Sequence, residues 1–297
     1  MTRTTRRAGG SVFDALNVLI MTLLCLICVV PVLHIIFASL SDPRRLLTNS
    51  GILLRPLGFS TEGYQLIFSN SVIVSGYINT LYYVAAGTAI STLLTIMGGY
   101  ALSRKNLYWG KAIMFLITFT MFFSGGLIPF FLVVDNLGMR NTRAALIIPS
   151  AVNAFNLIIM RTSMKKLPES IEESALIDGA NAFTIMFRIV VPLSSATVAV
   201  VALFYAVGTW NAWFNASIFL NDRKLYPLQL VLKEILVSSD TSAVLNTSTD
   251  TTGKTMDIYK PLVKYCTIVA ATLPVLCFYP FVQKFFVTGM MVGSIKE

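Results

Sequence analysis

The residues of this 297-residue chain that are best placed for chemistry lie in one polar stretch, Leu167 to Pro192, between two long apolar segments. Its acidic side chains are Glu169, Glu172, Glu173 and Asp178. No histidine, metal-ligand pattern or glycine-rich phosphate motif accompanies these carboxylates, so the stretch does not indicate catalysis. A polar segment this well specified, placed between apolar segments, predicts a docking surface for a partner.

The elements that would position this stretch can be read from its helix signals. Pro168 suits the first turn of a helix, where its missing N–H costs nothing, and the glutamates follow at the positive end of the helix dipole. Gly179 tolerates the left-handed conformation that ends a helix, and Asn181 can cap a second one. We therefore expect a short helix, a glycine turn and another helix leading to Pro192.

The order Glu173-Ser174-Ala175, three residues, Gly179, nine residues and Ile189-Val190-Val191-Pro192 resembles the EAA loop of ABC-importer permeases of the carbohydrate, maltose-permease type. Ser174 and Val191 depart from the motif, and both are conservative in size. The resemblance implies a cytoplasmic coupling loop over residues 161–192 that contacts an ATPase. The coupling residues carried over by the motif are Glu173, Ser174, Ala175, Leu176, Asp178, Gly179, Ile189 and Pro192.

Composition indicates an all-α, polytopic membrane protein, because 55% of the residues are hydrophobic and only 12% are charged. The net charge of +9 suggests contact with membrane lipid at the inner leaflet and not with nucleic acid. Basic residues on the N-terminal tail and short loops favour an N-terminus in the cytoplasm. Six transmembrane helices are expected in a single domain, at about 15–40, 76–103, 112–134, 144–160, 193–220 and 265–287. Between the last two, we expect an amphipathic stretch at 228–237 and a flexible tract at 238–255.

The expected spans are nearly free of ionisable side chains, which the driving ion of a coupled transporter normally needs. The sequence also lacks a P-loop and a nucleophile or metal cluster. We therefore expect a transport subunit that is not an enzyme, has no cofactor or metal, and is driven by a partner. Two alternatives remain open: a secondary transporter of a small solute, and a membrane scaffold subunit with no pathway of its own.

The resemblance names the partners of such a subunit. It implies a second permease, either a paralogue or another copy, two copies of a cytoplasmic ABC ATPase and an extracytoplasmic sugar-binding protein in the cell membrane. It extends to Tyr100-Ala101-Leu102-Ser103-Arg104, Asn211-Ala212-Trp213 and Tyr279-Pro280-Phe281, and the C-terminal residues look like those of permeases for complex oligosaccharides.

Candidate residues of the substrate pathway are amides and aromatic rings at membrane depth, because sugars present hydroxyl rims and apolar faces. They are Asn153, Asn156, Trp210, Asn211, Trp213 and Asn215. For the tryptophans, the alternative is an interfacial aromatic belt; for the asparagines, it is hydrogen bonding between helices.

Overall fold

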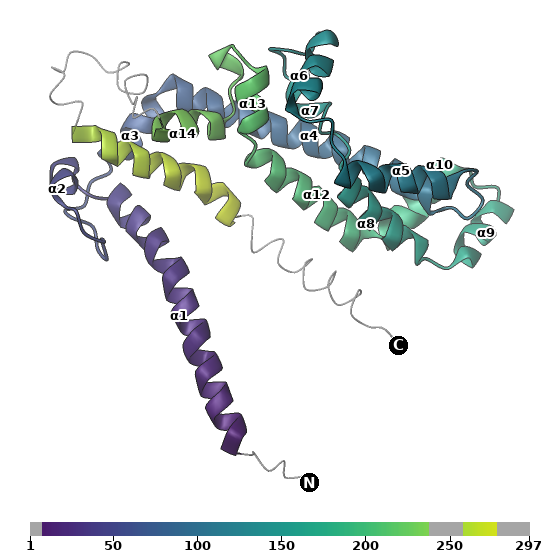
Figure 1. Ribbon diagram of the computed structural model, residues 1–297, viewed down its shortest axis with the longest axis horizontal. Coiled ribbons are helices and arrows are strands. Elements are labelled where there is room, and N and C mark those ends of the chain that lie inside the picture. The colour runs from purple at the N-terminus through teal and green to yellow at the C-terminus, as the bar shows by residue number, and fades with distance from the viewer. Residues whose placement is uncertain (1–7, 238–257, 278–297) are drawn as a thin grey trace. The chain divides into compact units, whose positions relative to one another are not determined.

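The computed structural model describes residues 8–237 and 258–277 (Figure 1). Most of these residues are helical, and β-pairing among them is limited to one isolated bridge between Ser41 and Phe59. The chain groups into two compact units, Met1–Asn70 with Ile235–Thr272, and Ser71–Glu234 with Leu273–Glu297. The all-α prediction is thus confirmed for the part of the chain that the structure describes.

Three described helices are long and apolar enough to cross a membrane: Phe13–Ser39 within α1 (Ala8–Ser39), α4 (Ser71–Ser103) and Ile258–Cys277. Two further pairs qualify if each bent pair counts as one span. Gly110–Phe122 and Leu127–Asn136 meet at 115°, and Ala182–Leu193 and Ser195–Trp210 meet at 87°. By length and composition, this part of the chain therefore holds up to five candidate spans, and the count of six stays a prediction.

The first unit is held together around one end of α1. Its shorter helices are α2 (Pro43–Thr48) and α3 (Glu62–Ser69), and the first part of helix Ile258–Cys277 completes it. Ser39 of α1 hydrogen-bonds the Tyr64 hydroxyl at 2.7 Å, and the Cys266 thiol donates to the Ser39 carbonyl at 3.3 Å. Gly63 permits this packing, because a Cβ there would lie 2.5 Å from the Cys266 Sγ.

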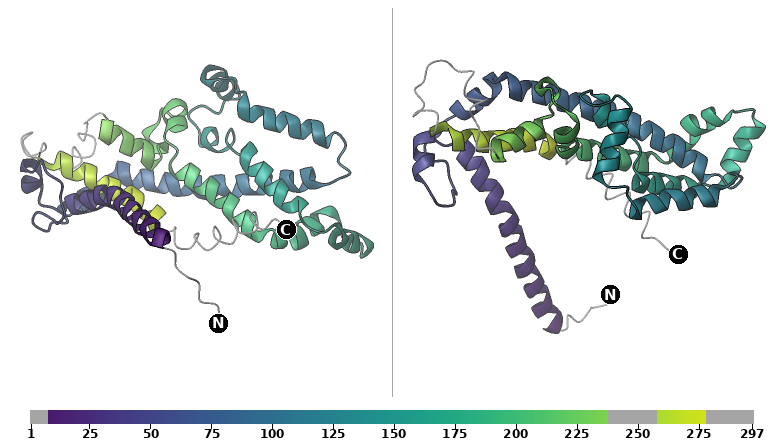
Figure 2. Two further views of the ribbon diagram at one scale, coloured as in Figure 1. Left: turned by 60° about the horizontal axis from the view of Figure 1, so that its bottom comes forward. Right: turned by 45° about the horizontal axis from the view of Figure 1, so that its top comes forward.

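The second unit is built on α4, which packs against α8 (Ala154–Lys165) and α12 (Ser195–Trp210) (Figures 1 and 2). Its other elements are α5 (Gly110–Phe122), α6 (Leu127–Asn136), α7 (Ala144–Ile147), α9 (Glu169–Ile177), α10 (Ala182–Ile185), the π-helical turn Met186–Val190, α11 (Val191–Leu193), α13 (Phe214–Phe219), the 3₁₀ turn Arg223–Leu225 and α14 (Leu228–Val237), whose last residues belong to the first unit. The stretch predicted to be amphipathic is this last helix.

Small residues on one face of α4 allow its neighbours to approach closely, as is usual between membrane helices. The buried small residues are Gly76, Thr80, Gly87, Ser91, Thr95, Gly99 and Ser103. At Gly99 a Cβ would lie only 2.7 Å from the Met160 Cγ of α8. The other end of α4 is fixed by polar bonds, since the amide of Asn79 donates to the carbonyls of Lys224 and Tyr226 at 2.6 and 3.1 Å.

The structure differs from the sequence predictions where helix breakers decide the outcome. The predicted span 112–134 is interrupted: α5 ends at Phe122, where Phe123 is extended, and α6 begins directly after Gly126, whose φ is 83°. The predicted span 144–160 is two helices, because the Asn153 side chain caps a new helix by accepting from the Asn156 N–H at 3.2 Å. The tract 238–255, the end of the predicted span 265–287 and the motif at 279–281 lie outside the described residues.

Candidate functional site

The predicted coupling loop begins with α9, which ends at the predicted glycine but starts one residue after the proline expected in its first turn. Pro168 takes the position just before the helix, with φ −60° and ψ 132°. At the other end the N–H of Ala180 donates to the Ala175 carbonyl at 2.9 Å, and the N–H of Gly179 donates to Leu176 at 3.0 Å. This pair of bonds is a Schellman motif, and it requires the φ of +81° that Gly179 adopts.

The two faces of α9 have different surroundings. Ala175 is only 8% exposed and packs in an apolar cluster with Met160, Met164 and Ile185. Leu176 and Ile177 lie on the other face, with 59% and 86% of their surface exposed. The predicted residues Glu173, Ser174 and Asp178 are exposed as well. A helix with one face in the core and large apolar side chains on the other presents a contact surface.

The second half of the loop turns sharply into α12. The Asn181 side chain caps α10 as expected, accepting from the Thr184 N–H at 2.9 Å. A π-helical turn, Met186–Val190, follows and includes the half-buried Ile189. Pro192 lies within the helical stretch Ala182–Leu193, and the bend comes two residues later at Ser194, where this stretch and Ser195–Trp210 meet at 87°.

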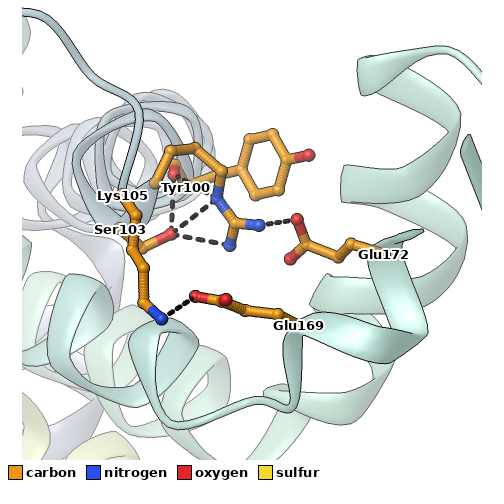
Figure 3. Close-up of polar contacts among 6 residues, drawn as sticks. Tyr100, Ser103, Lys105, Glu169 and Glu172 are labelled. Atoms are coloured by element: carbon orange, nitrogen blue, oxygen red, sulfur yellow. Dashed lines mark hydrogen bonds and ion pairs between the residues drawn. The ribbon is translucent and has the colours of Figure 1, made fainter.

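The structure adds a group of charges that the motif does not contain, at the end of α4 (Figure 3). Arg104 forms an ion pair with Glu172 of α9, and its guanidinium also donates to the Ser103 hydroxyl at 2.8 and 3.2 Å and to the Tyr100 carbonyl at 3.3 Å. The same guanidinium stacks over the Tyr100 ring, 4.4 Å from its centre. A guanidinium held in this way has its direction set before it meets the carboxylate.

A second ion pair joins Lys105 and Glu169, with 2.7 Å between Nζ and Oε1. It lies in solvent, with the two side chains 70% and 55% exposed, whereas the Arg104 and Glu172 side chains are 28% and 15% exposed. Burial lowers the pKa of Arg104 from its ordinary value, and the neighbouring Tyr100 and the Glu169 carboxylate act in the opposite direction. Arginine remains charged at any physiological pH in spite of such a shift.

Sequence reasoning assigned the acidic residues Glu169 and Glu172 only to the helix dipole and did not pair them with Arg104 and Lys105. One signal could have found the pairs. Arg104 and Lys105 follow one apolar helix, and Glu169 and Glu172 begin another helix on the same predicted side of the membrane. The two glutamates are three residues apart, so they share a helix face and can pair with the two cations together. Glu173, the glutamate of the motif, is exposed and forms no ion pair within the part of the chain that the structure describes.

The second unit contains a cavity of about 290 Å³, and three of the six substrate candidates line it. Asn153, Asn156 and Asn215 line it together with Tyr83, Tyr205 and Thr209. The Asn156 side chain, 5% exposed, makes no hydrogen bond within the described residues, so its amide is free for a ligand. The Tyr205 hydroxyl is engaged by Thr95 at 2.7 Å and by the Asn153 N–H at 3.0 Å.

The remaining candidates do not line this cavity. Trp210 is 7% exposed and packs inside the unit. The Asn211 amide donates back to the Val207 carbonyl of its own helix at 3.0 Å. Trp213 is 40% exposed, with the Lys233 ammonium 5.5 Å from its ring centre. The tertiary structure therefore brings the three asparagines together and leaves the tryptophans apart from them.

Comparisons with known proteins agree over nearly the whole chain. Residues 91–292 match the family described as "Binding-protein-dependent transport system inner membrane component". The chain is 40% identical, over 96% of its length and 98% of the relative's, to the polygalacturonan/rhamnogalacturonan transport system permease protein YtcP of Bacillus subtilis (strain 168). It is 38% identical to Protein LplC of the same organism, over 97% and 96% of the two chains.

A solved structure is similar as well: a bacterial ABC transporter involved in the import of the acidic polysaccharide alginate, with a TM-score of 0.86 and 28% identity over 95% of this chain and 99% of that one. These likenesses support an ABC sugar permease over a secondary transporter. They also place ATP hydrolysis on a separate chain and imply an ATPase, a binding protein and a second permease as partners. The chain is a multi-pass membrane protein that belongs to the family of binding-protein-dependent transport system inner membrane components.

Proposed function

We propose that this permease imports acidic oligosaccharides delivered by an extracytoplasmic binding protein, in a membrane complex with a paralogous permease and two copies of an ABC ATPase. In this arrangement the chain has six spans, and its N-terminus and the loop 161–192 are cytoplasmic. The observation that carries the proposal is the two-faced helix α9. Its Ala175 face is packed in the unit, while Leu176 and Ile177 are exposed for a partner.

In this proposal Ala175 packs α9 against its own unit, whereas the motif predicted that it contacts the ATPase. Its small side chain allows α9 to lie close to α8 and is not available to a cleft on the ATPase. The docking contact therefore comes from the exposed face, with Leu176 and Ile177 as apolar anchors and Glu173 beside them. Gly179 and Asn181 set the direction in which the chain leaves α9, and the 87° bend into α12 follows at Ser194.

The acidic substrate class is supported by the relatives and by one cation. The transporters that this chain resembles are described as handling polygalacturonan or rhamnogalacturonan, and the acidic polysaccharide alginate. Arg143 precedes α7, whose Leu146 lines the cavity, and its guanidinium lies 4.5 Å from the ring centre of Tyr82. It hydrogen-bonds only the neutral Asn79 among the described residues, at 3.4 Å, so it is available to pair with a sugar carboxylate.

The assembly is tested by purifying the tagged chain from its native membranes in mild detergent and assaying the eluate for ATPase activity. We expect an ATPase and a second permease to copurify, and the ATPase to be lost when Leu176 and Ile177 are both replaced by aspartate. An isolated chain that transports solute into liposomes without ATP would contradict the proposal.

The substrate class is tested by uptake of labelled oligogalacturonate in competition with a neutral oligosaccharide of equal length. Arg143→Gln removes the cation and keeps the hydrogen-bonding length of the side chain. We expect the preference for the acidic sugar to fall about tenfold, the factor that a lost charge-assisted interaction of about 1.4 kcal/mol gives. An unchanged preference would remove Arg143 from the pathway, and uptake of the neutral sugar alone would refute the acidic class.

A further inference from the structure

We propose that Arg104 and Lys105 form a clamp with Glu172 and Glu169 that fastens α9 to the end of α4, so that the two helices move as one body during transport. The proposal rests on the docking of α9 to an ATPase and adds the route by which its movement reaches the substrate cavity. The clamp residues are positioning residues, because they contact neither ATP nor sugar.

The geometry of Arg104 suits a permanent attachment. Its guanidinium has four separate interactions, with Ser103, the Tyr100 carbonyl, the Tyr100 ring and Glu172. The first three involve residues of α4 itself, and they hold the side chain in place for its ion pair with Glu172 of α9. The Ser103 hydroxyl is in turn fixed, since it donates to the Tyr100 carbonyl at 2.7 Å. Less side-chain entropy is then lost when Glu172 binds.

Without the clamp, α9 would have few restraints. It is joined to α8 through the short segment Lys166–Pro168 and to α10 through the glycine turn, and both are places where a chain can pivot. Its buried anchor, Ala175, offers a single methyl group to the core. Glu172 precedes Ala175 by three residues, so both lie on one face of the helix and hold it at successive turns.

The clamp connects this anchored helix to the cavity through α4. Tyr83, which lines the cavity, lies 20 residues before Ser103 in the same uninterrupted helix, a distance of about 30 Å at 1.5 Å per residue. The Tyr83 hydroxyl donates to the Leu225 carbonyl at 2.8 Å. A tilt of α4 that starts at the clamp therefore moves the cavity wall and the segment bonded to it.

The two ion pairs contribute unequally. Lys105 and Glu169 are mostly in solvent, where an ion pair is worth little and is screened by salt. Arg104 and Glu172 are largely shielded from solvent, and their pair is supported by hydrogen bonds to Ser103 and Tyr100. The attachment therefore depends mainly on Arg104, and it should persist at salt concentrations that weaken the outer pair.

The test uses the whole importer in proteoliposomes and measures labelled oligogalacturonate transported per ATP hydrolysed. The variants are Arg104→Glu, Glu172→Arg and the charge swap that combines them. Lys111→Glu is the matched control, since Lys111 is exposed at the start of α5 on the same side and pairs with no carboxylate in the described part of the chain. We expect each single reversal to lower the ratio about tenfold, which corresponds to about 1.4 kcal/mol. The swap should recover part of this loss, because it restores the ion pair but not the bonds of the guanidinium to Ser103 and Tyr100.

A second readout requires no substrate. Spin labels at Thr162→Cys on α8 and Ile177→Cys on α9, in a variant without the native cysteines, report the angle between α9 and the α4–α8 pair. The clamp predicts a narrow distance distribution that Arg104→Glu broadens and the charge swap narrows again. Unchanged ratios and distances in the single reversals, or a swap as defective as they are, would overturn the clamp. Failure of the wild-type chain to bind an ATPase would instead overturn the proposed function. The spin-label distances would still show whether the clamp holds α9, because they are measured without the ATPase.

Discussion

Adding a single Cβ atom at Gly179 should uncouple ATP hydrolysis from transport. Its φ of +81° lies in the left-handed region, and its N–H and that of Ala180 close the end of α9 onto Leu176 and Ala175. We consider three replacements, Gly179→Ala, Gly179→Asn and Gly179→Val. They differ in how well each residue tolerates this backbone conformation, and the resulting order tests the conformational explanation.

The free-energy cost of each replacement can be estimated simply, because an added Cβ would clash with nothing in this chain. A Cβ built on Gly179 meets no atom within 4 Å, so the cost is that of the backbone alone. For an ordinary L-residue the left-handed conformation costs about 1–2 kcal/mol. Asparagine adopts it more readily because its side chain bonds locally, and valine, being β-branched, adopts it least. The population of the correctly turned loop should fall about 5- to 30-fold with alanine, more with valine and less with asparagine.

The assay reconstitutes the complete importer and measures ATP hydrolysis and sugar uptake side by side for the three variants. We expect uptake per ATP to fall in the order glycine, asparagine, alanine, valine, with equal amounts of each variant inserted in the membrane. Normal coupling in the valine variant would refute the reasoning. An asparagine variant as defective as valine would show that side-chain volume in the partner's cleft, and not backbone conformation, makes glycine necessary.

Three further predictions concern the α4–α8–α12 packing and the cavity. Tyr205→Phe removes the hydroxyl that accepts from the Asn153 N–H, and we expect a loss of about 1–3 kcal/mol, seen as a lower melting temperature in detergent. Gly99→Leu places atoms where the Met160 side chain lies and should destabilise the unit by about 1–3 kcal/mol or more, by the same measurement. Asn156→Ala removes a free amide from the cavity and should lower oligogalacturonate uptake while ATP hydrolysis and the melting temperature stay normal. A melting temperature that is unchanged for Tyr205→Phe and Gly99→Leu, or uptake unchanged for Asn156→Ala, would contradict the packing and cavity assignments.

The local elements of the coupling loop could be predicted because each depends on the chemistry of one residue. Only glycine takes the φ of Gly179 without strain, and only a short polar side chain caps α10 as Asn181 does. Gly126, directly before α6, uses the same backbone freedom, with a φ of 83°. Helix boundaries were harder: the cap at Asn153 splits a predicted span, because an apolar segment does not show whether its polar residue faces a neighbour or starts a helix.

The sequence by itself determined that this is a helical membrane subunit whose polar loop belongs to an importer. Hydrophobic length, helix breakers and the loop motif are local properties that do not depend on how the helices pack. Only the tertiary structure decided that Glu172 and not Glu173 pairs with Arg104, that Ala175 faces inward, and that three of the six pathway candidates line one cavity. Each of these depends on the rotation of a helix about its axis, which close packing against its neighbours fixes and a linear pattern leaves open.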